Sequence, residues 1–244
     1  PVVLVNSDEE IGSPDSAPQI RRLARCANRA LILEPGHGPE GKLKTARKGV
    51  LRFDVSITGK AAHAGAAPEQ GASAILELSY VIQKLFGLND PARGVTVNVG
   101  VVQGGLRPNV VAPESRAEVD VRVLTQEDAK RVAGAILSLQ ATTPGTRLEV
   151  RQGHGVAPLE FSERNRRLWE LAHEAGRGLG LELDHCLVGG ASDGNTTSQF
   201  TATLDGLGVL GDGAHASHEF VYLDKLAERG ALLALLIMAP PLPQ

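Results

Sequence analysis

The sequence predicts an α/β protein in which a ferredoxin-like α+β domain interrupts a larger α/β domain. Two short apolar runs, residues 2–5 and 30–33, each stop at carboxylates, as buried strands do when their carboxyl ends carry a site. From residue 51 the apolar pattern changes to a period of two, which is typical of half-buried antiparallel strands. Over residues 48–153 the expected elements follow the order β-α-β-β-α-β.

Composition excludes several classes of function. The 244 residues are 42% hydrophobic and 22% charged, enough to bury one large or two modest cores. With a net charge of -3 and 3% aromatic residues, the chain has no evident surface for nucleic acid. The apolar run 231–239 is shorter than the ~20 residues that span a bilayer, so it predicts a buried helix and no membrane contact. Cys26 and Cys186 lack metal or disulfide spacing and are expected in the core.

The first part of the chain gathers carboxylates. Asp8, Glu9 and Glu10 follow the first apolar run after only Asn6 and Ser7. Adjacent carboxylates repel, so such a cluster indicates either a bound cation or a solvated helix start, and the pattern leaves both open. A helix over residues 16–28 is expected next, and then a strand that ends at Glu34. If the two strands are neighbours, Glu34 lies beside the other acids.

The middle of the chain is predicted to be a separate domain that begins after the polar, basic segment 41–48. Strands are expected at residues 51–59, 95–102, 115–123 and 146–151, and helices at 72–86 and 125–140. Thr125 and Asp128 resemble a capping box at the start of the second helix. The arrangement predicts an antiparallel sheet with two helices on one face. Its open edges would be covered if two copies paired.

From residue 155 the chain is expected to return to the first domain. Helices are predicted at residues 162–180 and 223–239, and a short buried strand at 206–210. Gly189 and Gly190 open a glycine-rich loop, which would let backbone amides approach an anion, although any tight turn has a similar composition. The predicted domains are therefore 1–46 and 155–244, together one catalytic domain, and the inserted domain 47–154.

Six motifs in this order resemble the dizinc metallopeptidase and deacylase family that includes glutamate carboxypeptidase (carboxypeptidase G2), acetylornithine deacetylase and succinyl-diaminopimelate desuccinylase. They lie at residues 7–13, 57–69, 107–113, 120–122, 189–193 and 213–221. The resemblance covers essentially the whole chain, and the histidine loop at 57–69 most resembles glutamate carboxypeptidase. It implies a phosphorylase/hydrolase-like zinc peptidase domain with a ferredoxin-like lid domain that forms a homodimer.

The resemblance also implies roles for individual residues. It places the general base on Glu9, and it implies two zinc ions per subunit, with Glu10 and His215 on one ion and Glu34 on the other. His63 would reach the partner subunit's site and stabilise the oxyanion. The residues that would hold substrate are Asn109, Arg122, Gly189 and Gly190. For Arg122 an outward-facing surface charge stays open as the alternative.

Family members also carry an HxD motif and a further Asp upstream of the first strand, and neither occurs here. The chain starts without Met inside an apolar run, so we expect an upstream segment to be absent. Zinc usually takes three protein ligands at a catalytic site, so the 244 residues alone are expected to bind zinc poorly and to hydrolyse nothing. Any localisation signal would be absent too, which leaves cytoplasm and periplasm open.

The predicted function is a zinc-dependent hydrolase that cleaves an amide bond and releases a C-terminal amino acid, with glutamate a candidate. Peptides and N-acyl amino acids are the expected substrates. Two alternatives stay open: an aminoacylase or deacetylase of the same family, and a non-catalytic module for dimerisation or carboxylate binding. Pocket shape separates peptidase from deacylase, and the sequence does not reveal it.

Overall fold

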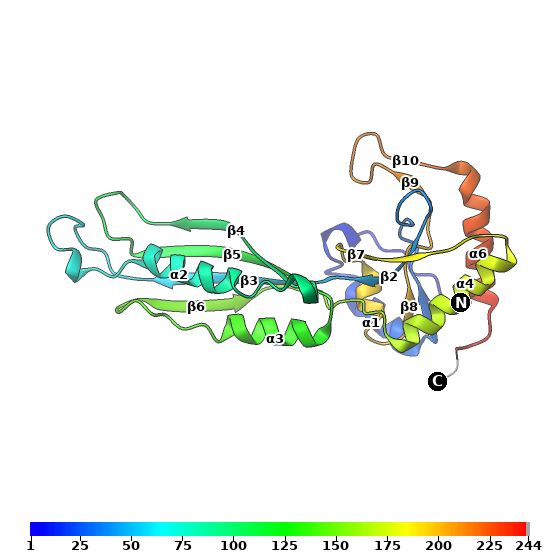
Figure 1. Cartoon of the computed structure of the whole chain (residues 1–244), viewed down its shortest axis with the longest axis horizontal. Helices are drawn as coiled ribbons and strands as arrows, with labels where there is room; N and C mark the ends of the chain where they lie inside the picture. Colours follow the sequence, from blue (N-terminus) through cyan, green and yellow to red (C-terminus); the bar gives the residue numbers. More distant parts are fainter. Residues whose placement is uncertain (243–244) are drawn as a thin grey trace. The chain divides into compact units, whose positions relative to one another are not determined.

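The computed structural model describes residues 1–242, which fall into two compact units (Figure 1). Unit 1 comprises Pro1–Lys48 and continues from Ala157, and unit 2 comprises Gly49–Val156. Each unit encloses its own cluster of buried hydrophobic side chains. None of the helices within residues 1–242 is long and apolar enough to cross a membrane.

Unit 2 is a four-stranded antiparallel sheet in the order β4-β5-β3-β6, with two helices on one face. Its elements are β3 (Gly49–Thr58), α2 (Ala74–Phe86), β4 (Thr96–Gly104), β5 (Glu114–Val123), α3 (Gln126–Leu137) and β6 (Arg147–Gln152), with 3₁₀ turns at Pro68–Gln70 and Pro91–Arg93. The predicted β-α-β-β-α-β order is confirmed. Period-two alternation in β3 buries Phe53, Val55 and Ile57 under the helices, while the polar residues between them face away.

The carboxylate of Glu77 in α2 is fully buried and ties this helix to the loop before β6. It accepts hydrogen bonds from the backbone N–H groups of Thr142 (3.0 Å) and Thr143 (2.6 Å), and from the Thr142 hydroxyl (3.1 Å). Burial raises the pKa of Glu77, but the hydrogen bonds from Thr143 and Thr142 outweigh it and leave that pKa below its ordinary value. The ionised side chain is therefore part of the packing of unit 2.

Replacing Glu77 with alanine is expected to lower the free energy of unfolding by about 3 kcal/mol, because two buried N–H groups lose their acceptor. Because the folded pKa is depressed, the contribution of Glu77 is present above its ordinary pKa of 4.5 and is lost as pH falls through the depressed value. Urea unfolding from pH 7 to pH 3 measures both effects. Glu69→Ala, at an exposed position of the same unit, is the control; equal stability of the two variants would contradict the assignment.

Unit 1 is built from three pairs of strands and four helices within the described residues. Its elements are α1 (Ala17–Cys26), β1 (Arg29–Leu31), β2 (Leu43–Arg47), α4 (Glu163–Gly178), β7 (His185–Val188), α5 (Asp193–Thr197), β8 (Ala202–Leu204), β9 (Gly211–Asp212), β10 (Phe220–Val221) and α6 (Leu226–Met238), with 3₁₀ turns at Glu9–Ile11 and Leu223–Lys225. β1 pairs in parallel with β8 and β2 with β7, while β9 and β10 are antiparallel. Leu43 and Leu204 pack with α4 and α6 in the core.

In the first part of unit 1, one predicted strand is wrong and one observed strand is not predicted. Residues 2–5 form no strand: Val2, Val3 and Val5 are 76%, 84% and 89% exposed, and no strand within residues 1–242 pairs with them. The sequence predicts no strand in the polar, basic segment 41–48, but this segment contains β2. Its alternation is real, with Leu43, Thr45 and Arg47 buried, but a threonine and an arginine occupy two of the inward positions and hide the apolar pattern.

Three later predictions are also corrected. The strand expected at 206–210 lies at 202–204, and β7 was not anticipated because its short run ends in the glycine-rich loop. The last helix is confirmed as α6, but Ile237 and Met238 in the apolar run are 46% and 73% exposed. Cys26 is exposed rather than in the core, because it occupies the outer face of the last turn of α1.

Candidate active site

Glu9, Glu10, Glu34 and His215 form an anionic cluster in unit 1. The Nε2 atom of His215 lies 3.9 Å from a carboxylate oxygen of Glu10, and both side chains are exposed. Glu34 is electrostatically coupled to Glu9 and to Glu10, so all three carboxylates share one region. Residues from three separate segments of the sequence therefore lie in one region of unit 1.

The pKa values of two carboxylates in the cluster, Glu9 and Glu34, are raised. Burial, together with repulsion from Glu34, Asp193 and Glu10, raises the pKa of Glu9 to about 7. Burial also raises the pKa of Glu34, and the carboxylate of Asp205 acts in the same direction. Such a group of carboxylates attracts cations, and a carboxyl group with a pKa near 7 is suited to transfer protons at neutral pH.

Glu10 and His215 offer the donor types that zinc accepts, a carboxylate oxygen and an imidazole nitrogen. Within residues 1–242, however, no three His, Cys, Asp or Glu side chains are grouped so that they could hold one metal ion. A catalytic zinc usually has three protein ligands. The residues present therefore fit part of a metal site, with one pair of donors and Glu34 as a separate carboxylate.

The neighbouring acid Asp8 has a different role. Its Oδ2 atom accepts hydrogen bonds from the backbone N–H groups of Asp15 (2.8 Å) and Ser16 (3.0 Å), just before α1. A side-chain hydrogen bond from Ser16 lowers the pKa of Asp8 and outweighs the effect of burial. Of the three consecutive acids, Asp8 thus binds the turn that precedes α1, and only Glu9 and Glu10 belong to the cluster.

Two non-glycine residues at the site have left-handed backbones: Ser13 with φ 53° and His215, a member of the cluster, with φ 63°. This region is unfavourable for residues with a Cβ, and such conformations persist only where the surroundings hold them. The Ser13 hydroxyl donates a 2.5 Å hydrogen bond to Asp193, and Asn6 donates a second of 2.8 Å. Asp193 therefore fastens the glycine-rich loop to the turn that carries Glu9.

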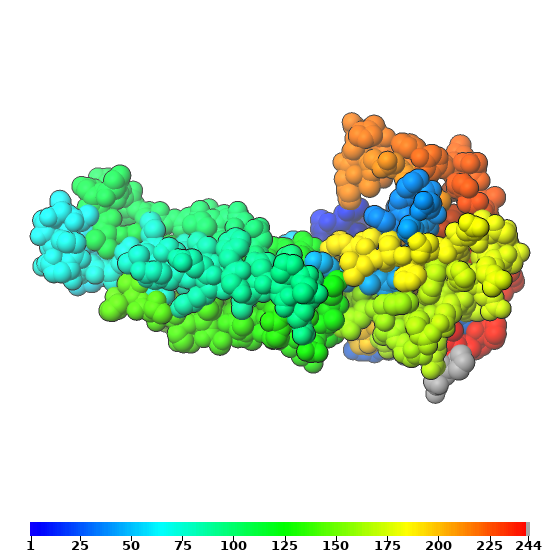
Figure 2. Space-filling model, viewed as in Figure 1, coloured from blue at the N-terminus to red at the C-terminus, as the bar shows by residue number. Residues whose placement is uncertain are grey.

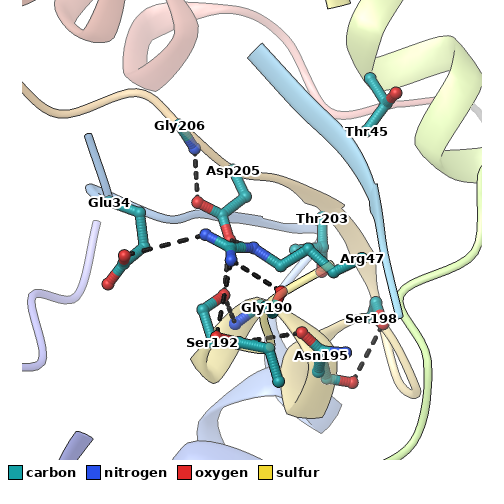
Figure 3. A network of polar contacts seen from close by, with 12 residues as sticks. Glu34, Thr45, Arg47, Gly190, Ser192, Asn195, Ser198, Thr203, Asp205 and Gly206 are labelled. Carbon is teal, nitrogen blue, oxygen red and sulfur yellow. Dashed lines mark hydrogen bonds and ion pairs between the residues drawn. The ribbon is translucent and has the colours of Figure 1, made fainter. Parts of the chain in front are cut away.

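The sequence alone does not single out Asp193, Arg47 or Asp205. Arg47 is buried and forms a 2.7 Å ion pair with Asp205, which is fully buried (Figure 3). Single charged residues at strand ends give no periodic signal. The position of Asp193 inside the glycine-rich motif was the one available clue.

His63 and Asn109 lie together in unit 2. The backbone N–H of Ala64 donates to the Asn109 carbonyl (3.0 Å), which joins the two loops. The His63 Nδ1 atom accepts from the N–H groups of Gly65 (3.2 Å) and Ala66 (3.1 Å). The neutral ring must then carry its proton on Nε2, where it can donate a hydrogen bond outward.

Arg122, also in unit 2, is already paired. Its Nε and Nη2 atoms donate to the two carboxylate oxygens of Asp120 at 2.7 and 3.1 Å. The pair lies on the polar face of β5 and is partly exposed. A substrate carboxylate that binds Arg122 would have to compete with Asp120.

The raised pKa of Glu9 predicts a pH-dependent stability. The folded pKa of Glu9 lies above the ordinary value of 4.5. The contribution of Glu9 to the free energy of unfolding is therefore fully present below pH 4.5 and is lost as pH rises through about 7. Glu9→Gln is therefore expected to be more stable than the wild type at pH 8, by about 1 kcal/mol after allowance for solvent screening, and to show little gain at pH 4.5.

Thermal unfolding between pH 4.5 and pH 8, in the presence of a chelator, measures this gain. Glu40→Gln, with a side chain that is 74% exposed, controls for the loss of one surface carboxylate. If the gain of Glu9→Gln over this control is the same at pH 4.5 and pH 8, burial of Glu9 in a repulsive cluster is the wrong explanation.

Comparison with known proteins gives consistent results. Residues 45–155 match the family model of the M20 peptidase dimerisation domain. The chain is 30% identical over 248 residues to carboxypeptidase G2 of Pseudomonas sp. (strain RS-16), covering 97% of this chain and 58% of that protein. It is 33% identical over 142 residues to a probable carboxypeptidase of Uncinocarpus reesii, covering 52% of this chain and 32% of that protein. The chain thus spans less than two thirds of these relatives.

Solved structures share the fold. Aminopeptidase PepT from Bacillus cereus has a TM-score of 0.76 at 24% identity, over 93% of this chain and 61% of that one. A tripeptidase from Staphylococcus aureus has a TM-score of 0.65 at 22% identity, over 86% of this chain and 56% of that one. At this level of identity the likeness concerns the fold alone.

Proposed function

This chain is a carboxypeptidase G2 homologue that carries an M20 peptidase dimerisation domain, and from that premise we propose that it belongs to a zinc-dependent hydrolase that releases a C-terminal amino acid. The expected substrates are peptides and N-acyl amino acids, with glutamate a candidate for the released residue. The observation that carries the proposal is the convergence of Glu9, Glu10, Glu34 and His215. The names of the relatives fit amide hydrolysis.

In this proposal Glu10 and His215 hold one zinc ion and Glu34 contributes to a second, and no group of three such side chains within residues 1–242 completes either site. Zinc, when bound, would lower the pKa of a water molecule and polarise the substrate carbonyl. Glu9 accepts a proton from the attacking water and returns it to the leaving amine. A pKa of about 7 for the metal-free group is compatible with both transfers.

The substrate is held and polarised by residues of the lid. We assign residues 47–154 to this lid and dimerisation domain, and residues 1–46 and 155–244 to two parts of the catalytic domain. The Nε2–H group of His63 would donate to the carbonyl oxygen as negative charge develops, in the partner subunit's site. Asn109 and Arg122 of unit 2 are proposed substrate-binding residues, and so are Gly189 and Gly190 in the glycine-rich loop of unit 1.

The dimer would form through α2 and β4 of unit 2. β4 is an edge strand, so its outer backbone groups are open to a further strand. Large apolar side chains are exposed on both elements: Ile75, Leu76, Tyr80, Val101 and Val102. α2 lies at the surface of unit 2 in Figure 2. A second copy of this dimerisation domain is the partner that the family match favours.

A hydrolysis assay tests the proposed function. The 244-residue chain, and the same chain with any flanking coding sequence, are incubated with p-aminobenzoyl-glutamate, an N-acetyl amino acid and a dipeptide. We expect release of free amino acid that requires zinc and stops on addition of a chelator, from the longer protein only. Preference for the N-acetyl substrate would favour an aminoacylase. Tight binding of the substrates without turnover would favour a carboxylate-binding module.

A further inference from the structure

Arg47, at the end of β2, is a buried arginine whose guanidinium faces three different segments of unit 1. It is 4% exposed. Figure 3 shows it between Glu34, which follows β1, Asp205, which follows β8, and Gly190 of the glycine-rich loop. A planar guanidinium can direct separate N–H groups to several partners at once, which an ammonium group on a flexible stem does far less well.

Two of the three nitrogen atoms of the Arg47 guanidinium are held by hydrogen bonds. The Nε–H group donates to Asp205 at 2.7 Å, and Nη1 donates to the carbonyl oxygen of Gly190 at 3.0 Å. Asp205 is itself held, because it accepts from the Ser192 hydroxyl at 2.6 Å and from the backbone N–H of Gly206. The guanidinium therefore has little freedom to turn.

The Nη2 group of Arg47 forms a long ion pair with Glu34 but no hydrogen bond. Nη2 lies 3.8 Å from a carboxylate oxygen of Glu34, which is too long for a hydrogen bond. This atom is buried and has no hydrogen-bond partner among residues 1–242. A buried donor without a partner is costly, so the arrangement indicates that Arg47 attracts Glu34 electrostatically while the carboxylate lone pairs stay available to another ligand.

We propose that Arg47 is a positioning residue that holds the Glu34 carboxylate ready for a divalent cation and, with the same guanidinium, fixes the substrate-binding loop at Gly190. This inference rests on the proposed function for the role of Glu34 as a metal ligand. It goes beyond that function because it proposes that one buried side chain, Arg47, links the metal ligand Glu34 to the loop at Gly190. Lys44 also attracts Glu34, whereas Arg47 both attracts Glu34 and donates to the Gly190 carbonyl.

Arg47→Lys tests the proposal, because it keeps the charge and removes the planar fork. Zinc affinity is measured by competition with a chromophoric chelator, on the protein with any coding sequence that flanks these residues. We expect about 10-fold weaker binding of one zinc ion, the usual effect of losing a partner that orients a ligand. The same ion should be lost more completely in Glu34→Gln.

Arg229→Lys is the matched control. Arg229 is also buried in unit 1, but its guanidinium donates to the backbone carbonyl oxygens of Gly41, Gly206 and Gly208 and not to the carboxylate cluster. The Arg229→Lys variant should therefore have a lower thermal stability than the wild type and an unchanged zinc affinity. Equal loss of zinc in Arg229→Lys and Arg47→Lys would reduce Arg47 to a structural role and overturn the inference.

The remaining outcomes separate the inference from the proposed function. If Glu34→Gln binds zinc like the wild type, Glu34 is not a ligand and the proposed function is wrong at that residue. If Glu34→Gln weakens zinc binding and Arg47→Lys does not, the inference alone fails.

Should Arg47→Lys not fold, Ser192→Ala is the alternative variant, because it removes a hydrogen bond that fixes Asp205 and keeps every charge. Ser192→Ala is expected to weaken zinc binding about threefold, because its effect on Glu34 is indirect and smaller than the loss of an orienting partner. An unchanged zinc affinity in this variant would overturn the proposal.

Discussion

Glutamine in place of Glu9 is expected to lower kcat for amide hydrolysis by about 10³-fold, because the side chain keeps its shape but no longer accepts a proton. Zinc content should be unchanged, since Glu10 and His215 are the proposed ligands and Glu9 is not. KM should change little, because the proton transfer contributes to the transition state and not to substrate binding. The measurement is steady-state kinetics with metal analysis of the same preparation, made on the protein with any coding sequence that flanks these residues, as in the hydrolysis assay.

Glu10→Gln provides the contrast for this prediction. It is expected to reduce both zinc content and activity, because a neutral amide is a poor ligand for zinc compared with a carboxylate. Glu40→Gln, at an exposed position of the same unit, should alter neither. If Glu9→Gln retains activity, or loses zinc to the same extent as Glu10→Gln, the assignment of Glu9 as general base is wrong.

The second large effect concerns the dimer. Leu76→Asp combined with Val102→Asp is expected to weaken self-association by at least about 100-fold, because each substitution buries a charge in an apolar interface. The two side chains are 45% and 53% exposed in the single chain. Sedimentation equilibrium measures the shift from dimer to monomer. Activity should fall with it, by about 10²-fold, if His63 acts in the partner's site.

Leu137→Asp is the matched control. Leu137 ends α3 in the same unit and is 47% exposed, but it does not belong to the apolar surface of α2 and β4. This variant should remain a dimer with normal activity. A double variant that stays dimeric would refute the interface. A monomer with full activity would refute the action of His63 across the dimer.

Period-two patterns made unit 2 predictable from the sequence. In β3 and β5 nearly every second residue is buried in one cluster, so strand positions and the order of elements follow directly. Helices with good caps were also predictable, as at Thr125, which accepts a hydrogen bond from the Asp128 N–H at 3.0 Å. Local chemistry and tertiary packing agree in these elements.

Unit 1 was harder to predict because its strands are short and none shows a period-two pattern of apolar residues. β1 and β8 have three residues each, and β2 buries a threonine and an arginine as well as an apolar residue. The run 2–5 shows the opposite failure. Its strand-forming residues predict a strand, but strand structure requires a neighbour, and none pairs with it within residues 1–242.

In the candidate site, too, some residues could be predicted from the sequence and others could not. Glu9, Glu10, Glu34 and His215 could be selected because motifs identify them, and the structure places them in one cluster. The supporting contacts of Arg47, Asp193 and Asp205 depend on which loops meet in three dimensions. A sequence does not contain that information in any local pattern.

The most direct test of the central claim is the position of zinc in crystals of the protein, determined from anomalous scattering at the zinc absorption edge. The claim is that the cluster of Glu9, Glu10, Glu34 and His215 is a metal-dependent hydrolytic site. It predicts an anomalous peak in contact with Glu10 and His215. Full zinc occupancy elsewhere, with no peak beside these two residues, would contradict it.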